Sequence, residues 1–268
     1  MPVLKMDNRD GALWVTFNRP DHFNSLDPES MCAIMDMWQQ AETDDSVRLV
    51  VLTGTGDKAF CAGADLKLSI PLLSGDRQPE TEFDHRLRDT PDWLSQLMQR
   101  NQSFSKPVIA AINGTAIAGG CELALASDIR IASSNASFAL TEARIGIVPA
   151  GGSMVRLPRQ IPWCHAMEFM LTGDTISAEQ ARDMGLINRV VAPEDLYAEV
   201  DKLVAKLIGN APLSLQAIKR TATITSGMEL EQAFAIEDRE ASAIIVSEDA
   251  KEGPRAFAEK RQAVFQGR

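Results

Sequence analysis

Apolar residues dominate one internal stretch, residues 106–128, which reads KPVIAAINGTAIAGGCELALASD. Its first apolar run, residues 108–112, has the length and the β-branched content of a buried strand. Two breaks follow, at Asn113-Gly114 and at 118–120, and from Cys121 onward the residues favour a helix. We therefore predict a buried strand, a tight connection and a helix, in that order, near the middle of the chain.

Strand and helix patterns alternate along the chain up to about residue 192. Asp10-Gly11 favours a hairpin turn between two short apolar segments, of which the second covers residues 12–17. Asp27 followed by Pro28 indicates a helix that lasts to about residue 42, because aspartate caps a helix and proline fits its first position. The remaining predicted elements are strands at 47–53, 129–132 and 137–140 and helices at 91–104, 162–172 and 177–184.

Two regions depart from this alternation. Residues 70–92 form the most polar internal stretch, and we interpret them as a mobile, partly ordered insertion. From Pro193 the pattern is helical almost to the end of the chain, so we divide the chain into a core, 1–192, and a helical C-terminal segment, 193–268. The breaks predicted within the helical segment are at 210–212, 226–227 and 253–254.

Composition and charge argue against several classes of function. With 268 residues the chain is long enough to bury a sizeable core. Its formal net charge of -10 and isoelectric point near 4.9 argue against a surface that binds nucleic acid. Polar residues interrupt the apolar stretch at 106–128, whereas a helix that spans a bilayer needs roughly 20 apolar residues. We expect neither nucleic acid nor a membrane as a partner.

Cysteine and histidine positions argue against a metal site. The four cysteines are scattered without a CxxC spacing, and the three histidines lie far apart without an HExxH spacing. Scattered free thiols are typical of a reducing compartment. The first residues, MPVLKMDNRDG, lack the charged and then apolar layout of a secretory signal. The sequence therefore predicts a cytoplasmic protein that holds no metal.

A motif that imitates a nucleotide-binding loop lies at residues 54–59. Gly54, Gly56 and Ala59 match the pattern G-x-G-x-x-A of dinucleotide-binding proteins. That fingerprint requires a helix to begin inside the motif, whereas helical character returns here only near Leu66. We therefore expect no nicotinamide site in this loop.

Gly119-Gly120 and Glu122 combine the start of a helix with a carboxylate. Glycines at a helix start let a ligand approach the backbone closely and leave unpaired N–H groups at the positive end of the helix dipole. Two interpretations of Glu122 stay open from these residues alone. It is either an ordinary partner of the helix dipole or an acid–base group beside an anion-stabilising backbone.

Four short motifs are the most distinctive feature of the chain. They are Asn18-Arg19-Pro20, FCAGAD at 60–65, AGGCE at 118–122 and the segment from Glu142 to Pro149. Together they resemble the crotonase family, and enoyl-CoA hydratases most of all. The resemblance implies an α/β fold made of a spiral of ββα repeats, an acyl-CoA thioester as ligand and an α-helical C-terminal segment that forms trimers. It covers nearly the whole chain, continuing through 171–174 and 181–186 to 257–261.

By this resemblance, the backbone N–H groups of Ala64 and Gly119 form an oxyanion hole. Reaction next to a thioester places negative charge on its carbonyl oxygen, which two fixed donors stabilise; losing one such donor typically costs about 3–4 kcal/mol. Backbone donors explain why small residues occupy both motifs. Ala150 stands where many members of the family have glycine, and its N–H is expected to hold the reacting water if its φ is negative.

The family's two catalytic carboxylates correspond to Glu122 and Glu142. In a hydratase, Glu122 activates the water that attacks the β-carbon, and Glu142 delivers a proton to the α-carbon. Two carboxylates in an apolar site should raise at least one pKa. An isomerase needs only the carboxylate at Glu142, so the pair favours reversible hydration of a trans-2-enoyl-CoA. The alternatives are an enoyl-CoA isomerase, another acyl-CoA lyase or dehydratase, and a non-catalytic acyl-CoA-binding protein.

The resemblance also assigns contacts to coenzyme A, which is part of the substrate, so no separate cofactor is expected. It further implies a homotrimer or a hexamer built from two trimers. The residues assigned to CoA are Ala62, Asp65 and Leu66 around the adenine, Arg19 and His22 near the phosphates, and Phe257 and Lys260, which reach the CoA of a neighbouring subunit.

Overall fold

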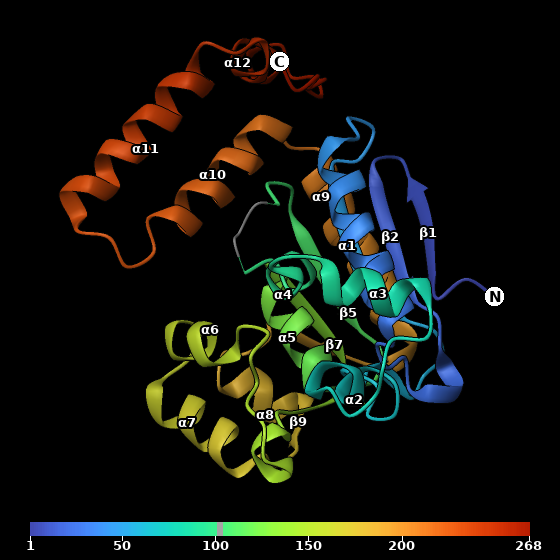
Figure 1. Ribbon diagram of the computed structural model, residues 1–268. Helices are drawn as coiled ribbons and strands as arrows, with labels where there is room; N and C mark the ends of the chain where they lie inside the picture. The colour runs from blue at the N-terminus through green and yellow to red at the C-terminus, as the bar shows by residue number, and fades with distance from the viewer. Residues whose placement is uncertain (101–103) are drawn as a thin grey trace.

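The computed structural model describes residues 1–100 and 104–268, and within these residues the chain forms two β-sheets (Figure 1). The larger sheet has the spatial order β1 (Leu4–Arg9), β2 (Ala12–Phe17), β3 (Leu49–Gly54), β5 (Val108–Ile112), β7 (Ile129–Ser133) and β10 (Arg189–Val191). The smaller sheet has the order β4 (Ala59–Cys61), β6 (Thr115–Ile117), β8 (Ser137–Ala139) and β9 (Ile176–Ser177). Neighbouring strands are parallel except in the pairs β1–β2 and β8–β9.

Successive strand pairs contribute one strand to each sheet. β3 is followed by β4, β5 by β6 and β7 by β8, and a helical segment follows each pair. These segments are α2 (Ser69–Ser74), α5 (Gly119–Ala126) and, after β8, η2 (Glu142–Ile145) and α6 (Ser153–Gln160). This arrangement confirms the expected α/β spiral of ββα repeats. Because β6 and β8 are parallel neighbours, α5 and η2 follow from the same edge of the smaller sheet.

Apolar side chains cover both faces of the larger sheet. On one face, Trp14 and Ile109 pack with Val200 of α9 (Leu196–Ile208). The two sheets meet at Phe17 and Phe60, whose rings pack edge to face with centroids 5.3 Å apart. Burial of each such side chain contributes about 1.5–3 kcal/mol. α9 therefore packs as part of the core. The predicted division of the chain into a core, 1–192, and a C-terminal segment, 193–268, stays a prediction.

Most predicted elements are present within a few residues. β1 and β2 form the hairpin around Asp10-Gly11, and the Asp27 side chain accepts the Ser30 N–H at 2.8 Å to cap α1 (Pro28–Thr43). The strands β4, β6, β9 and β10 were not predicted, because two or three residues are too few to show a periodicity. The other expected helices are present as η3 (Pro193–Asp195), α7 (Trp163–Thr172) and α8 (Ala178–Asp183), whereas η1 (Pro20–His22), η2 and α6 were not predicted.

The partly ordered insertion predicted at 70–92 contains much of α2 and all of α3 (Glu82–Asp89). The helix predicted over 91–104 is wrong in length, because α4 covers only Trp93–Leu97. Positive φ angles at Asp92 (51°) and Gln99 (49°) take the backbone out of the right-handed helix on both sides of α4. The last part of that predicted helix, 101–103, lies outside the described residues.

Three helices, α10 (Pro212–Ile224), α11 (Leu230–Ile245) and α12 (Glu248–Ala258), extend away from the sheets (Figure 1). The breaks predicted at 210–212 and 226–227 are confirmed, but the one at 253–254 is wrong because α12 runs through it. The Phe265 ring packs beside Gly253, and the Asp249 carboxylate accepts N–H groups from the returning chain end. Among the described residues, no helix combines the length and the apolar character that a bilayer span requires.

Candidate active site

The start of α5 packs directly on β4, and a missing side chain makes this possible. A Cβ atom added to Gly120 would lie only 1.9 Å from the Cys61 carbonyl oxygen. Ala118, just before the helix, has a φ of 51° and donates its N–H to the Ala139 carbonyl at 2.9 Å. A positive φ at alanine is strained, and such strain concentrates at functional sites. The local sequence thus fixes the direction in which the first turn of α5 points.

The N–H groups of Ala64 and Gly119 border one small space. A Cβ added to Gly63, which has a φ of +82°, would lie 2.8 Å from the Gly119 nitrogen, and one added to Gly119 would lie 3.7 Å from the Ala64 nitrogen. Within the described residues, neither N–H donates to a protein acceptor. The structure therefore brings the two predicted donors together, and both are free to bind an oxygen atom.

Glu122 lies in the first turn of α5 and is 4% exposed. Its Oε1 accepts the Ser153 N–H at 3.0 Å, and a Cβ on Gly151 would lie 2.4 Å from its Oε2. Burial raises the pKa of Glu122; N–H groups of Ser153 and Gly151 and the charge of Arg156 oppose this effect without reversing it. Glu122 is thus a buried carboxylate held by the backbone strip 151–153, which follows η2.

Glu142 is the first residue of η2 and is 5% exposed. In the part of the chain that the structure describes, its Oε2 has no hydrogen-bond partner. Burial, with a further contribution from the charge of Glu122, raises the pKa of Glu142 to about 7. A carboxyl group with this pKa can give or take a proton near neutrality, and its unpartnered oxygen is available to a substrate or a water.

Ser153 and Arg156 are parts of the site that the sequence analysis missed. Besides its N–H bond to Glu122, Ser153 has a fully buried hydroxyl beside the same carboxylate. The Arg156 side chain donates to the carbonyls of Gly151 (3.3 Å) and Met98 (2.8 Å). The adjacent Gly151-Gly152 pair before a helix was the available signal, since it resembles the glycine pair at the start of α5.

Ala150 lies immediately before this strip. Its φ is negative, which meets the condition set for its backbone N–H, and the residue is exposed. Its role in holding a water stays a prediction.

Arg19 and Asp65, two residues assigned to CoA, pair with each other. Arg19 is 3.1 Å from both Asp65 and Asp27, and its side chain is 13% exposed. The Asp65 carboxylate also accepts the Lys67 and Leu68 N–H groups, so it fixes the loop after β4. These charges largely compensate one another within the chain, which favours a structural role for Arg19 and Asp65 over contact with CoA.

The other assigned CoA residues fall into two separate regions. Ala62 is half-buried and donates its N–H to the carbonyl of Phe23, which adjoins the exposed His22, and Leu66 is 65% exposed in the loop that follows Ala62. Phe257 is 86% exposed at the end of α12, and Lys260 follows that helix. Figure 1 shows α12 far from α5, so the chain does not bring this pair to its own catalytic residues. All these CoA contacts stay predictions.

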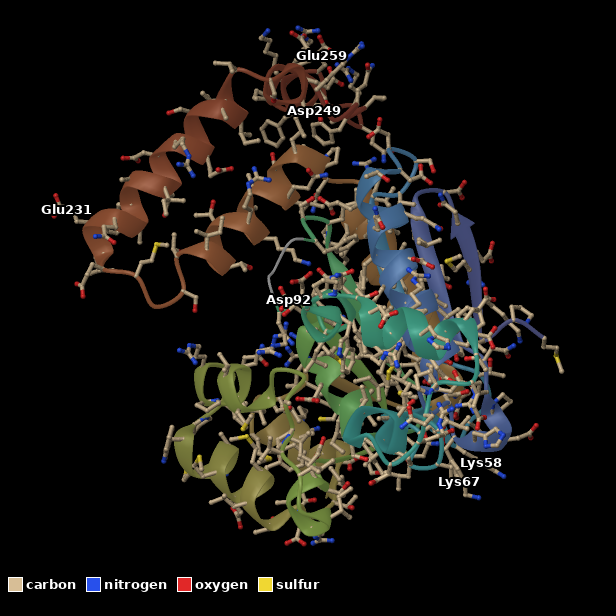
Figure 2. All side chains as sticks on the ribbon, viewed as in Figure 1. Lys58, Lys67, Asp92, Glu231, Asp249 and Glu259 are labelled. Carbon is tan, nitrogen blue, oxygen red and sulfur yellow. The ribbon has the colours of Figure 1, made fainter. Side chains whose placement is uncertain are left out.

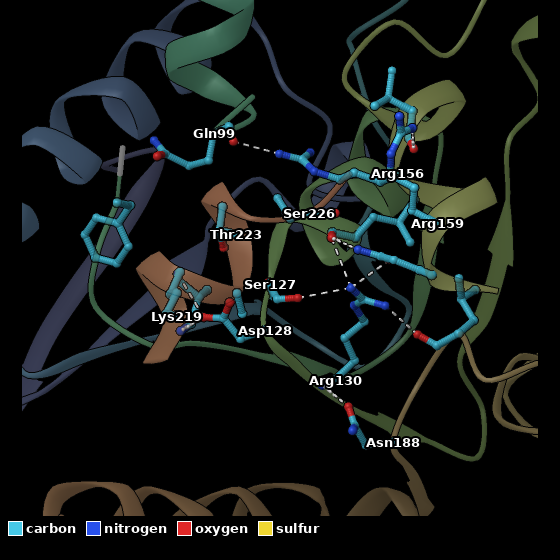
Figure 3. Close-up of a pocket in the computed structure, with 18 of the residues that line it drawn as sticks. Gln99, Ser127, Asp128, Arg130, Arg156, Arg159, Asn188, Lys219, Thr223 and Ser226 are labelled. Atoms are coloured by element: carbon cyan, nitrogen blue, oxygen red, sulfur yellow. Dashed lines mark hydrogen bonds and ion pairs between the residues drawn. The ribbon is translucent and has the colours of Figure 1, made fainter. Parts of the chain in front are cut away.

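A cavity of about 790 Å³ lies between α10 and the core (Figure 3). Glu122 and Glu142 are not among the residues that line it. Two of its cationic side chains pair with carboxylates, Lys219 with Asp128 at 2.8 Å and Arg220 with Glu240, and Arg130 donates to five surrounding oxygen atoms. We therefore assign this cavity to the packing of the C-terminal helices and not to the reaction.

Comparisons with known proteins identify a family and relatives over almost the whole chain. A family model described as "Enoyl-CoA hydratase/isomerase" matches residues 7–268. The chain is 41% identical to (E)-benzylidenesuccinyl-CoA hydratase of Thauera aromatica, with all of both chains covered. It is 39% identical to enoyl-CoA hydratase EchA19 of Mycobacterium tuberculosis, over 100% of this chain and 97% of the relative. The crystal structure of an enoyl-CoA hydratase from Bacillus anthracis superposes with a TM-score of 0.89 at 32% identity, covering 99% and 100% of the two chains.

Proposed function

Because the chain belongs to the enoyl-CoA hydratase/isomerase family, we propose that it catalyses the reversible syn addition of water to a trans-2-enoyl-CoA, giving a 3-hydroxyacyl-CoA. One observation carries this choice within the family. Two buried carboxylates, Glu122 and Glu142, interact electrostatically. Their elements follow from the same edge of the smaller sheet, and the backbone N–H groups of Ala64 and Gly119 are free within the described residues. Hydration needs two acid–base groups and an anion-stabilising pair of donors, and this arrangement supplies both.

The thioester carbonyl oxygen accepts hydrogen bonds from the N–H groups of Ala64 and Gly119. As water adds to the β-carbon, electron density moves to this oxygen and the enolate-like state gains most from the two donors. Since both donors belong to the backbone and are held by the Gly63 and Gly120 contacts, they need no reorganisation during the reaction.

The two glutamates divide the proton transfers. Glu122 accepts a proton from the attacking water as the carbon–oxygen bond forms at the β-carbon, and the N–H of Ala150 holds that water. Glu142 gives its proton to the α-carbon, which collapses the enolate-like state. A pKa of about 7 at Glu142 supports this role, because a carboxyl group of ordinary acidity would hold almost no proton at neutral pH.

The subunits complete the binding of CoA in a homotrimer or a hexamer. Phe257 and Lys260 are exposed and distant from α5 within one chain, which supports their contact with the CoA of a neighbouring subunit. Ala62 and Leu66 border the adenine of the chain's own ligand, with His22 near the phosphates, while the paired Arg19 and Asp65 hold the loop after β4 in place.

An enoyl-CoA isomerase is the second candidate within the same family. It would need only one carboxylate to shuttle a proton, for which Glu142 has a suitable pKa. Gly151 and the Ser153 N–H pack closely around Glu122. Burial of a carboxylate costs free energy, and only hydration gives a second buried carboxylate a role in proton transfer, so this packing favours hydration over isomerisation. A non-catalytic acyl-CoA-binding protein would need neither buried carboxylate.

The test is a panel of trans-2-enoyl-CoA thioesters of increasing chain length, followed by the loss of absorbance of the conjugated enoyl thioester. We expect hydration of at least one member, with the 3-hydroxyacyl-CoA identified by mass. The Glu122→Gln/Glu142→Gln double variant is the matched control and should leave the absorbance unchanged. Conversion of 3-enoyl-CoA to 2-enoyl-CoA without a mass increase of one water would instead identify an isomerase.

A further inference from the structure

Met98 lies between the two halves of the candidate site. Its Cε is 3.4 Å from the point where a Cβ on Gly119 would lie, and its Cγ is 3.1 Å from the corresponding point on Gly151. Gly119 carries one of the two free N–H groups, and Gly151 packs on the Glu122 carboxylate. The Met98 side chain therefore lies along the space between the carbonyl-binding donors and the acid–base group, where the reacting carbons must bind.

The backbone of Met98 is held firmly from two sides. The Arg156 guanidinium donates to the carbonyls of Met98 at 2.8 Å and Gln99 at 2.7 Å, as Figure 3 shows for Gln99. One residue earlier, the Leu97 carbonyl accepts the Trp38 indole N–H at 3.1 Å. The side chain beyond this fixed backbone is an unbranched thioether with three rotatable bonds, which can adapt to different neighbours.

We propose that Met98 determines which acyl groups the site accepts. Its side chain is 4% exposed and stands against both Gly119 and Gly151, so it occupies the space beside the β-carbon and forms a wall for the substituent there. With methionine in place, the site favours acyl groups that are narrow and unbranched at the β-carbon. A rigid aromatic ring at that carbon requires the thioether to move aside. The proposal rests on the proposed function in taking an acyl-CoA thioester as ligand.

A residue that only filled the core would behave differently. Met98 belongs to the same apolar cluster as Leu97, which is fully buried. If Met98 only filled space, shortening it would reduce stability and lower activity toward all thioesters by a similar factor. A wall beside the reacting carbon instead changes the ratio between substrates, and one methylene of pocket space changes such a ratio by about 10- to 200-fold.

The experiment compares Met98→Ala, Met98→Leu and the neighbouring core control Leu97→Ala on crotonyl-CoA and cinnamoyl-CoA. In Met98→Ala the kcat/KM ratio of cinnamoyl-CoA to crotonyl-CoA should rise about tenfold or more, while Leu97→Ala should leave the ratio within about twofold of wild type. Met98→Leu keeps the volume but removes the atom that reaches Gly119, so it should move the ratio about threefold in the same direction. If the alanine variant does not fold, the leucine variant decides, and an unchanged ratio overturns the proposal.

A binding measurement separates this proposal from the proposed function. Calorimetry with butyryl-CoA and 3-phenylpropanoyl-CoA needs no turnover, and the affinity ratio should shift toward the aromatic thioester in Met98→Ala. If no enoyl-CoA is hydrated but this ratio shifts, the proposed hydration fails and the role of Met98 stands. If hydration persists and neither ratio moves, the role of Met98 is overturned. If neither thioester binds the wild-type protein, both proposals are overturned.

Discussion

Glu122 and Glu142 belong to different elements, α5 and η2, yet the charge of Glu122 contributes to the raised pKa of Glu142. The two carboxyl groups are not equivalent. Glu122 accepts a backbone N–H bond that stabilises its anion, whereas Oε2 of Glu142 has no partner in the described part of the chain. A proton shared by the pair therefore resides mainly on Glu142, and this asymmetry assigns the base and the acid.

The first prediction concerns the pH dependence of the two directions of the reaction. Hydration needs protonated Glu142, so its kcat/KM should fall as the pH rises through about 7, the pKa of this group. Dehydration starts from the same pair with its one proton on Glu122, so its kcat/KM should follow the same pH profile, as a reaction without net proton uptake requires. Hydration should also fall at acid pH once Glu122 is protonated, above the ordinary pKa of glutamate because burial raises it. A kcat/KM for hydration that stays level as the pH rises through 7 would contradict the role of Glu142 as the acid.

The second prediction concerns removal of each carboxylate without loss of size. Glu122→Gln and Glu142→Gln should each lower kcat for hydration by about 10²–10⁴, the range of a positioned acid or base. The double change should cost much less than the product of the two, because both groups act on one water and one substrate. Acyl-CoA affinity should survive in all three variants, since the carbonyl donors are backbone groups. Near-normal hydration in Glu122→Gln would return this residue to the role of a helix-dipole partner.

The third prediction compares alanine at the two glycines that begin α5. At Gly120 a Cβ would lie 1.9 Å from a backbone oxygen, so Gly120→Ala should lower the free energy of unfolding by about 3 kcal/mol or more. At Gly119 the nearest atom would be at an ordinary 3.4 Å, so Gly119→Ala should fold normally. Its new methyl group would nevertheless lie 3.7 Å from the Ala64 nitrogen, where the thioester oxygen binds, and should lower kcat/KM tenfold or more. Thermal unfolding and steady-state kinetics on both variants check this contrast. A fully active Gly119→Ala would exclude the space between the two N–H groups as the carbonyl site.

The parts of the site that could be predicted lie within single short motifs. β5, the glycines at the start of α5 and the carboxylate in its first turn are neighbours in sequence, so composition and spacing predicted them, although the role of Glu122 stayed open until the family resemblance was added. The prediction of Glu142 as a catalytic residue required the family resemblance, because nothing in the sequence around a carboxylate that follows a three-residue strand indicates that it is buried.

The parts that could not be predicted depend on contacts between distant segments. Arg156 joins the site through carbonyls at Met98 and Gln99, more than fifty residues earlier, and an arginine is normally a surface residue. Arg19 was assigned to CoA because its local motif fits, but the two carboxylates that pair with it come together only in the folded chain. The chain end that returns to α12 likewise bonds to Asp249, and helical propensity does not represent such a contact between separate segments.

The fourth prediction concerns the insertion between α2 and α4. Asp84 is 1% exposed and accepts hydrogen bonds from Arg77, which lower its pKa, as well as the N–H groups of Glu80 and Thr81. Asp84→Ala removes all of these, and a loss of about 2 kcal/mol of local stability would speed amide exchange there roughly 30-fold. Glu80→Ala is the matched control, because its carboxylate is 76% exposed and 3.9 Å from Arg77. Hydrogen exchange read by mass spectrometry should therefore change over residues 75–90 in the first variant only.

The last prediction concerns assembly through α11. This helix has no buried residue among those described, and Leu230, Phe234 and Ile245 are 72%, 58% and 71% exposed at helical spacing along it. Exposed apolar side chains of this size are typical of a face that another subunit covers. Sedimentation velocity should give the mass of a trimer or a hexamer for the wild-type chain. Phe234→Asp combined with Ile245→Asp should shift it to monomer.

The matched control for this prediction is Glu231→Lys, since Figure 2 shows Glu231 at the outer end of the same helix, directed away from the core. It should leave the mass unchanged, because reversing an exposed charge removes no apolar contact. The monomeric variant should also bind acyl-CoA more weakly than wild type, because Phe257 and Lys260 then have no neighbouring CoA to reach. A wild-type chain that sediments as a stable monomer at micromolar concentration would contradict the assembly. If a monomeric variant kept its acyl-CoA affinity, Phe257 and Lys260 would not belong to the binding site, because a contact between two subunits is absent in a monomer.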